Sequence, residues 1–319
     1  MNKEILCFLR YNLIQGNIFN TLKFYSIKFL KKIKKISRIK NYPLRYKYLL
    51  KEDLINIKDD NKVTQIIHDT FVNVDIKLAS RSFNIKTVSD IHKKFNDPED
   101  FESLHRFIWL RTLDIDKLNM NKINQIEKII IYWCQVNNQL NCNSSLIWHP
   151  YTISERIINI LYYYSKIKKN IPLNVRNNIH GSTNLLIKNL EFYEIGYGNH
   201  LLNNIRSILT YSLYFDNKQL QNIFTIMFEE YLDNFLIDGF SKDYSSHYQL
   251  LLCYWLFDLK QFLKIYENNS ILEIIDNYYD LIKSRALFFY NEKNNYFTFF
   301  GDISPDYSAE FLLENITSQ

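Results

Sequence analysis

The sequence predicts a mainly α-helical protein, built as a stack or ring of antiparallel helical hairpins. The 319 residues include only 6 Gly and 5 Pro, too few for the many turns of an all-β sandwich or barrel. Apolar residues recur at three- and four-residue steps through most of the chain after residue 119, which is the helical period. The segments between these stripes are short and polar, so consecutive helices should lie as antiparallel neighbours.

The first 95 residues differ from the rest, and we expect a basic arm followed by a small irregular lobe. Residues 1–51 hold 13 Lys or Arg and one acid, so they carry +12, whereas the whole chain carries +5. Residues 17–40 have the pattern of a basic amphipathic helix. This helix attaches to an anionic membrane surface, attracts an anionic polymer, or packs its apolar stripe on the body. Since the rest of the chain is acidic, we expect no nucleic-acid partner.

The elements after the arm follow from their periodicity. Residues 71–78 alternate apolar and polar side chains, which predicts a strand. Residues 98–110 start a helix with acids in its first turn. Further helices are predicted from residue 119 and over 152–166, 183–194, 199–215, 217–235, 245–265 and 271–290. Residues 295–308 read as an extended segment followed by a proline turn. We expect residues 96–319 to form one helical domain.

Several classes of protein are disfavoured by what the sequence lacks. The cysteines form no CxxC pair, which favours buried free thiols over a disulfide framework or a zinc cluster; they are Cys7, Cys134, Cys142 and Cys253. No two of the seven His stand four residues apart, so we predict no metal and no cofactor. Without a run of ~20 apolar residues or a clear signal peptide, we expect a cytoplasmic protein, peripheral to a membrane if the arm attaches it.

The first candidate site is the segment GYGNH, residues 196–200, where two of the scarce glycines precede a helix. Gly196 and Gly198 allow a positive φ or close approach of a ligand. Asn199 and His200 then lie in the first turn of the next helix, where free N–H groups and the helix dipole favour a carboxylate. Alternatively, Asn199 is an ordinary helix cap.

The second candidate site is DGFSKDYSSHYQ, residues 238–249, which also joins two helices. Tyr244 and Tyr248 are four residues apart and share a face if the helix has begun. The Tyr248 hydroxyl could act as a general acid or base, and His247 lies beside it. Alternatively, Tyr248 simply packs on the next hairpin.

Taken in order, three segments resemble the heparinase II/III family of polysaccharide lyases. They are WHPYTISERIINIL (148–161), NLEFYEIGYGNHLLNNIRSILTYSLYF (189–215) and DGFSKDYSSHYQLLLCYWLFDL (238–259). The resemblance covers roughly residues 95–315. It implies an incomplete (α/α) toroid, followed in the family by a large antiparallel β-sandwich.

The resemblance also implies a reaction, β-elimination at a uronic acid of an anionic polysaccharide or oligosaccharide. Asn199 and His200 match the residues that neutralise the uronate carboxylate, so that charge can develop as an enolate. Tyr248 best matches the Tyr that protonates the leaving oxygen or also serves as base, and Tyr244 is the alternative. Either His200 or His247 could be the base. Residues expected to line the same cleft are Trp109, Tyr151, Arg156, Tyr244 and His247.

The chain departs from the family pattern in one large respect. It stops at Gln319, just after the expected toroid, whereas the β-sandwich supplies a further catalytic His in many members. The site could therefore be completed by a partner chain, or it could bind without cleaving. This leaves two functions open: a uronate-polysaccharide lyase, or a non-catalytic sugar-binding or assembly protein in surface-polysaccharide biosynthesis. The basic arm favours the second.

Overall fold

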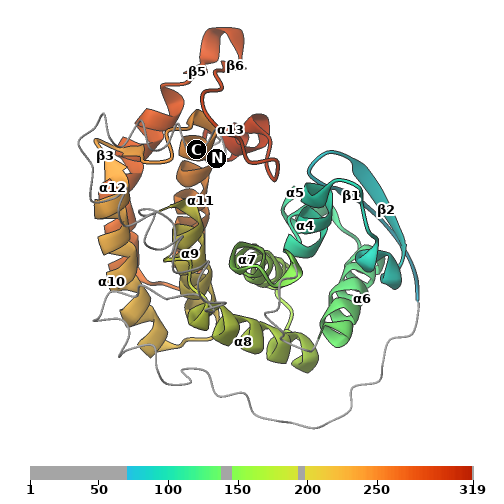
Figure 1. Cartoon of the computed structure of the whole chain (residues 1–319). Coiled ribbons are helices and arrows are strands. Elements are labelled where there is room, and N and C mark those ends of the chain that lie inside the picture. Colours follow the sequence, from blue (N-terminus) through green and yellow to red (C-terminus); the bar gives the residue numbers. More distant parts are fainter. Residues whose placement is uncertain (1–69, 138–145, 193–197, 318–319) are drawn as a thin grey trace, which may run out of the picture.

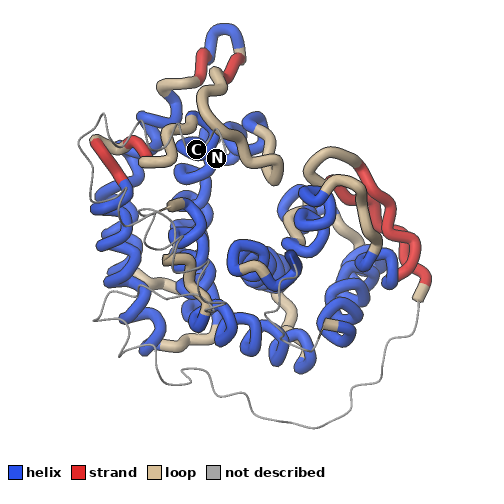
Figure 2. Tube along the Cα trace, in the orientation of Figure 1, coloured by secondary structure: helices blue, strands red, loops and turns tan. Residues whose placement is uncertain are grey.

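The computed structural model describes residues 70–137, 146–192 and 198–317. Helices dominate it, and they form an arc of hairpins (Figures 1 and 2). The predicted fold class, an incomplete (α/α) toroid, is thereby confirmed. The basic segment 17–40, Gly196, Cys7 and Cys142 lie outside the described residues. No described helix combines the length and apolar character that crossing a membrane requires.

The inner side of the arc is formed by three helices that start its main hairpins. They are α7 (Pro150–Ile167), α9 (Asn199–Tyr214) and α11 (Ser246–Ile265). α7 contacts α9, and α9 contacts α11. Each packs on the helix that follows it in the chain: α8 (Leu173–Lys188), α10 (Lys218–Phe235) and α12 (Asn269–Leu287). The inner helices bury most of their surface, because both neighbours and partners cover them.

One end of the arc carries the short helices and the β-hairpin. α4 (Pro98–Arg106), α5 (Trp109–Thr112) and the short 3₁₀ helix η2 (Ile115–Lys117) precede α6 (Met120–Val136), which packs on α8. β1 (Phe71–Lys77) pairs with β2 (Ser82–Thr87) as an antiparallel hairpin, and η1 (Val88–His92) follows. The alternate residues of β1 are buried, which confirms the strand predicted from period two. The hairpin packs on α5 and α6 and shares their core. The boundary between residues 95 and 96 stays a prediction.

The other end of the arc is the C-terminal segment. It contains β5 (Tyr290–Asn291), η4 (Glu292–Asn294), β6 (Tyr296–Phe297) and α13 (Ala309–Thr317), which packs on α11. β3 (Leu236–Ile237) and β4 (Phe240–Ser241) form a small hairpin between α10 and α11, and η3 (Leu146–Trp148) precedes α7. α13 was not predicted, because nine residues after a proline turn give too short a stripe to recognise.

Helix starts follow the capping residues of the sequence. In five of the described helices, the side chain of the residue before the helix accepts a hydrogen bond from a backbone N–H of the first turn. These capping residues are Asp97, Asn119, Asn217, Ser245 and Asn268. The helix predicted from residue 98 breaks at Phe107, whose φ of 57° is left-handed and ends α4. α8 starts ten residues before the predicted 183, because its first half carries a sparser stripe of Val175 and Ile179.

Candidate functional site

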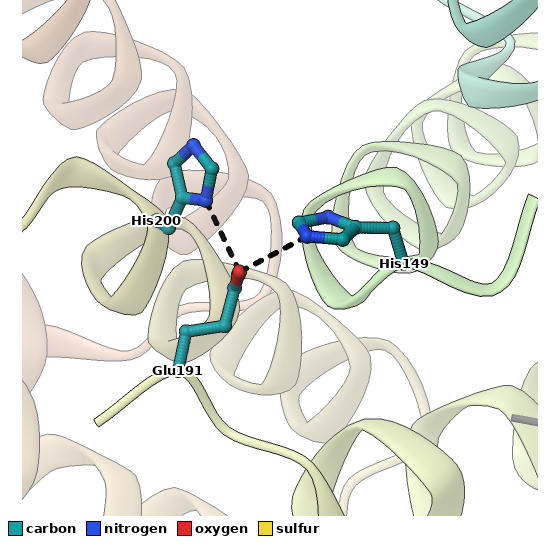
Figure 3. Close-up of side chains that lie close together, drawn as sticks. All are labelled: His149, Glu191 and His200. Atoms are coloured by element: carbon teal, nitrogen blue, oxygen red, sulfur yellow. Dashed lines mark hydrogen bonds and ion pairs between the residues drawn. The ribbon is translucent and has the colours of Figure 1, made fainter. Parts of the chain in front are cut away.

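His149, Glu191 and His200 form a cluster where α7 and α9 begin (Figure 3). The Nδ1 atom of His200 lies 3.1 Å from Oε1 of Glu191. The Nε2 atom of His149 lies 3.5 Å from the same oxygen. Both imidazoles therefore face one carboxylate oxygen, and all three side chains are partly accessible to solvent.

The local structure explains why these three side chains meet. His149 caps α7, with Pro150 at the first helical position, and its side chain makes no capping hydrogen bond. His200 is the second residue of α9. Glu191 follows α8, and Asn204 on α9 holds it in two ways. The Glu191 backbone N–H donates to Oδ1 of Asn204 at 3.0 Å, and Nδ2 of Asn204 donates to Oε2 of Glu191 at 3.2 Å.

Tyr151 connects this cluster to a buried group of charges. Its ring centroid lies 4.8 Å from that of His200, and the guanidinium of Arg106 lies 5.0 Å over the same ring. Burial raises the pKa of Tyr151 well above its usual value, and the charges of Glu155 and Asp306 raise it further. The hydroxyl therefore stays protonated at neutral pH.

Two arginines place cations beside these acids. Arg206 on α9 donates to Glu155 on α7 at 2.5 Å, and both side chains are buried. Arg106 on α4 binds Asp306 in the C-terminal segment. Burial raises the pKa of Asp306 to about 6, although Arg106 opposes the shift. One ion pair thus joins α7 with α9, and the other joins α4 with the C-terminal segment.

Tyr248 lies in the first turn of α11 and is half-buried. Burial raises its pKa to about 12, and the nearby charges of Asp302, Asp243 and Asp306 add to the effect. Asp306 thus raises the pKa of both Tyr248 and Tyr151. Tyr244 precedes the cap of α11 with a left-handed φ of 53°, and its side chain is 64% exposed.

Asn199 is the first residue of α9, and the cap of that helix is Gly198. The alternative that Asn199 is the cap is therefore wrong. Gly198 has a φ of −101°, so it does not use the positive φ that glycine allows. Its carbonyl instead accepts a hydrogen bond from the hydroxyl of Tyr231. Asn199 is half-buried beside His200.

Three other predicted residues are too buried to touch a sugar. Trp109 is fully buried, and its Nε1 faces the carbonyl of Leu104 at 3.4 Å. It packs the core because α5 turns inward after the break at Phe107. His247 is 2% exposed. Its Nε2 lies 3.0 Å from the carbonyl of Tyr307, and its Nδ1 accepts from the backbone N–H of Ser304 at 3.2 Å.

Arg156 is the third correction. Its guanidinium lies 4.4 Å from the ring centroid of Trp133 and 5.1 Å from that of Trp148. Its Nη1 donates to the backbone carbonyls of His105 and Ile147. Burial lowers its pKa to about 9. Arg156 therefore ties α7 to the chain around α4 and η3, and it cannot clamp a carboxylate in the cleft.

Sequence reasoning missed His149 and Glu191. A signal for both was present. His149 stands directly before the proline that starts a helix, and Glu191 stands nine residues before His200 in the segment that carries the resemblance. Arg106 pairs with Glu102 on its own helix, but its partner Asp306 and the partner of Arg206, Glu155, lie 200 and 51 residues away in sequence, so no local signal identifies these two contacts.

A cavity of about 710 Å³ lies beside the C-terminal segment. Its lining includes Asp306, Tyr307 and His247, together with Leu78 at the end of the β1 strand. Asn199, His200 and Tyr248 are not among its lining residues. The convergence of those three side chains on one cleft stays a prediction.

Comparison with known proteins adds one structural likeness. No family model matches the chain, and no curated protein has a matching sequence. Among solved structures, the chain is similar to the crystal structure of heparan sulfate lyase HepC from Pedobacter heparinus, with a TM-score of 0.47 and 14% sequence identity. The likeness covers 93% of this chain and 48% of the lyase chain, so the chain spans about half the length of that protein. A function has to be argued from the residues of the chain itself.

Proposed function

We propose that this chain is a polysaccharide-lyase-like protein that acts on a polysaccharide containing uronic acids. The observation that carries the proposal is the placement of Asn199 and His200 in the first turn of α9, with Glu191 orienting the imidazole. The sequence segments that contain these residues are those that resemble the heparinase II/III family.

The start of α9 suits a carboxylate for physical reasons. The first N–H groups of a helix have no partner within the helix, and the helix dipole makes this end positive. Asn199 adds an amide donor, and His200 adds an imidazole whose positive form Glu191 stabilises. A uronate bound here would have its negative charge offset, so that removal of the C5 proton could place charge on the carboxylate as an enolate.

In this proposal, Tyr248 is the residue that transfers the proton. Its phenolate takes the C5 proton, and the resulting phenol then protonates the departing 4-O oxygen as that bond breaks. A pKa of about 12 makes the phenolate a strong base and scarce at neutral pH. His247 is a poor alternative base, because both ring nitrogens face backbone groups and burial lowers its pKa.

The test is incubation of the full chain with a panel of uronic-acid polymers, following ultraviolet absorbance of the unsaturated product. A neutral glucan serves as the matched control, because it has no carboxylate to stabilise an enolate. We expect product from at least one uronate polymer and none from the glucan. Binding of each polymer is measured in parallel. Binding without product would replace the lyase by a sugar-binding protein, and the absence of both would refute the proposal.

A further inference from the structure

We infer that His149, Glu191 and His200 form a binding site for a divalent transition-metal ion, with Zn²⁺ as the best fit. The evidence for this site is the geometry of the three side chains, and it does not depend on the lyase function. Only its role toward a uronate carboxylate, described below, rests on the proposed function.

The distances match metal coordination. Zn²⁺ binds His nitrogen and carboxylate oxygen at about 2.0–2.2 Å, and two ligand atoms at a tetrahedral angle are then about 3.3 Å apart. The two observed His–Glu separations are 3.1 and 3.5 Å. The three ligand atoms lie within 4.8 Å of one another. Of the three ligands, His149 has the most exposed side chain, at 41%, so it is the one that would adjust on metal binding.

The ligand types select the ion. Two imidazoles and one carboxylate are a set that catalytic zinc sites use, with the fourth position taken by water or substrate. Ca²⁺ and Mg²⁺ prefer oxygen ligands only, so two imidazoles disfavour them. With Zn²⁺ bound, His200 is neutral, and the ion in place of a protonated imidazole would offset the charge of the uronate carboxylate.

The surroundings hold the ligands as metal sites usually do. Asn204 binds both the backbone N–H and Oε2 of Glu191, which leaves Oε1 directed at the two imidazoles (Figure 3). Nδ2 of Asn204 also contacts Oγ of Ser154 on α7 at 3.1 Å. The ring of Tyr151 packs on His200. Such outer contacts fix ligand orientation, and their loss typically weakens metal binding about 10–100-fold.

The experiment is zinc titration of the tag-free, chelator-treated full chain, by calorimetry and by competition with a chromophoric chelator. We expect one equivalent of Zn²⁺ per chain, and no competition from Ca²⁺. His149→Ala should abolish stoichiometric binding without unfolding the protein, because the His149 side chain caps nothing. Glu191→Gln should weaken binding strongly. Affinity should fall as the pH is lowered, since imidazole must be neutral to bind metal.

The matched control is His180→Gln on α8, which removes a half-buried imidazole bonded to Tyr211 and remote from the proposed ligand set. It should leave zinc affinity unchanged. Circular dichroism verifies that each variant is folded, and His149→Gln replaces any variant that is not.

Zinc bound equally well by His149→Ala and Glu191→Gln would overturn the site. An absence of stoichiometric binding would also overturn it and would make the cluster an ion pair only. Zinc binding without cleavage would refute the lyase function and leave the metal site standing, whereas cleavage that survives chelation would refute the metal's proposed role.

Discussion

Arg106 and Asp306 are 200 residues apart in sequence, and Nη1 of Arg106 donates to both carboxylate oxygens of Asp306 at 2.9 and 2.8 Å. Arg106 ends α4 near one end of the arc, and Asp306 lies in the C-terminal segment at the other. Their side chains are 8% and 1% exposed. This buried ion pair therefore connects the two ends of the helical arc.

Arg106→Met should destabilise the protein by about 3–5 kcal/mol, because the buried Asp306 carboxyl loses the cation that holds its pKa down, and Glu102 loses its ion-pair partner. Met keeps much of the length of the side chain, so the loss of charge dominates the result. The measurement is the free energy of unfolding in denaturant, at neutral pH where Asp306 is ionised.

Lys218→Met provides the control for charge removal, since Lys218 and Asp216 form an ion pair in which both side chains are more than 70% exposed. We expect no measurable change in the free energy of unfolding of Lys218→Met. Equal losses in the two variants would show that the Arg106 pair contributes no more than a surface pair.

Gly301→Ala should also destabilise the fold, by about 1–3 kcal/mol for the backbone strain alone. Gly301 has a φ of +79°, and an added Cβ would lie 2.5 Å from the carbonyl oxygen of Tyr244. The strain would loosen residues 300–302 from the start of α11, where Ser246 exchanges hydrogen bonds with Phe300. Denaturant unfolding measures the loss. Thr298→Ala, an exposed position in the same segment, should leave stability unchanged, and an equal loss there would contradict the strain argument.

Cys134 and Cys253 should resist alkylation in the folded protein. Both are buried free thiols, as the sequence predicted, and burial raises the pKa of each to about 12. Iodoacetamide reacts with the thiolate, which is then scarce even at about pH 8. Peptide mass spectrometry should find both unlabelled before denaturation and fully labelled after it. Labelling of either at the rate of a free cysteine in the native protein would show that its helix opens readily.

The sequence predicted most of the helices because their apolar stripes are local signals. The stripe of α12, with Ile275, Tyr279 and Ile282 buried at steps of four and three residues, is visible without any knowledge of its partner. The break at Phe107 was not visible, because a left-handed residue other than glycine depends on the packing around it. The early start of α8 was missed for a related reason, since polar residues dilute its first turns.

The site was predicted less completely, because its contacts join distant segments. Asn199, His200 and Tyr248 were predicted from glycine-containing segments before two helices, and the structure places all three in first turns, while their role stays a prediction. Arg156 shows the limit of such reasoning. An arginine in a helix stripe can bind a carboxylate or lie between two tryptophans, and only the fold places Trp133 and Trp148 around it.

Tyr248→Phe should abolish cleavage of a uronate polymer and leave binding largely intact, because the change removes only the hydroxyl that transfers the proton. Tyr244→Phe is the matched control, four residues earlier and 64% exposed. It should keep most of the activity. Product formation and polymer binding are measured on both variants. Full activity in Tyr248→Phe would assign Tyr248 to packing, the alternative that the sequence left open.

The pH dependence of cleavage distinguishes the two roles of Tyr248. Burial and the neighbouring acids raise its pKa to about 12, so the phenolate fraction grows about tenfold for each pH unit between about 7 and 10. If the phenolate takes the C5 proton, kcat/KM should rise with that slope, since the active form is the deprotonated one. If Tyr248 acts only as an acid, it is already fully protonated at neutral pH, so its titration does not increase kcat/KM over this range. The measurement is the initial rate at low substrate concentration across this range, with folding checked at each pH.

Asp302→Asn sharpens the test, because removing a carboxylate that raises the pKa of Tyr248 should increase the rate at a fixed neutral pH. A decrease in that variant, with binding retained, would contradict the phenolate as base.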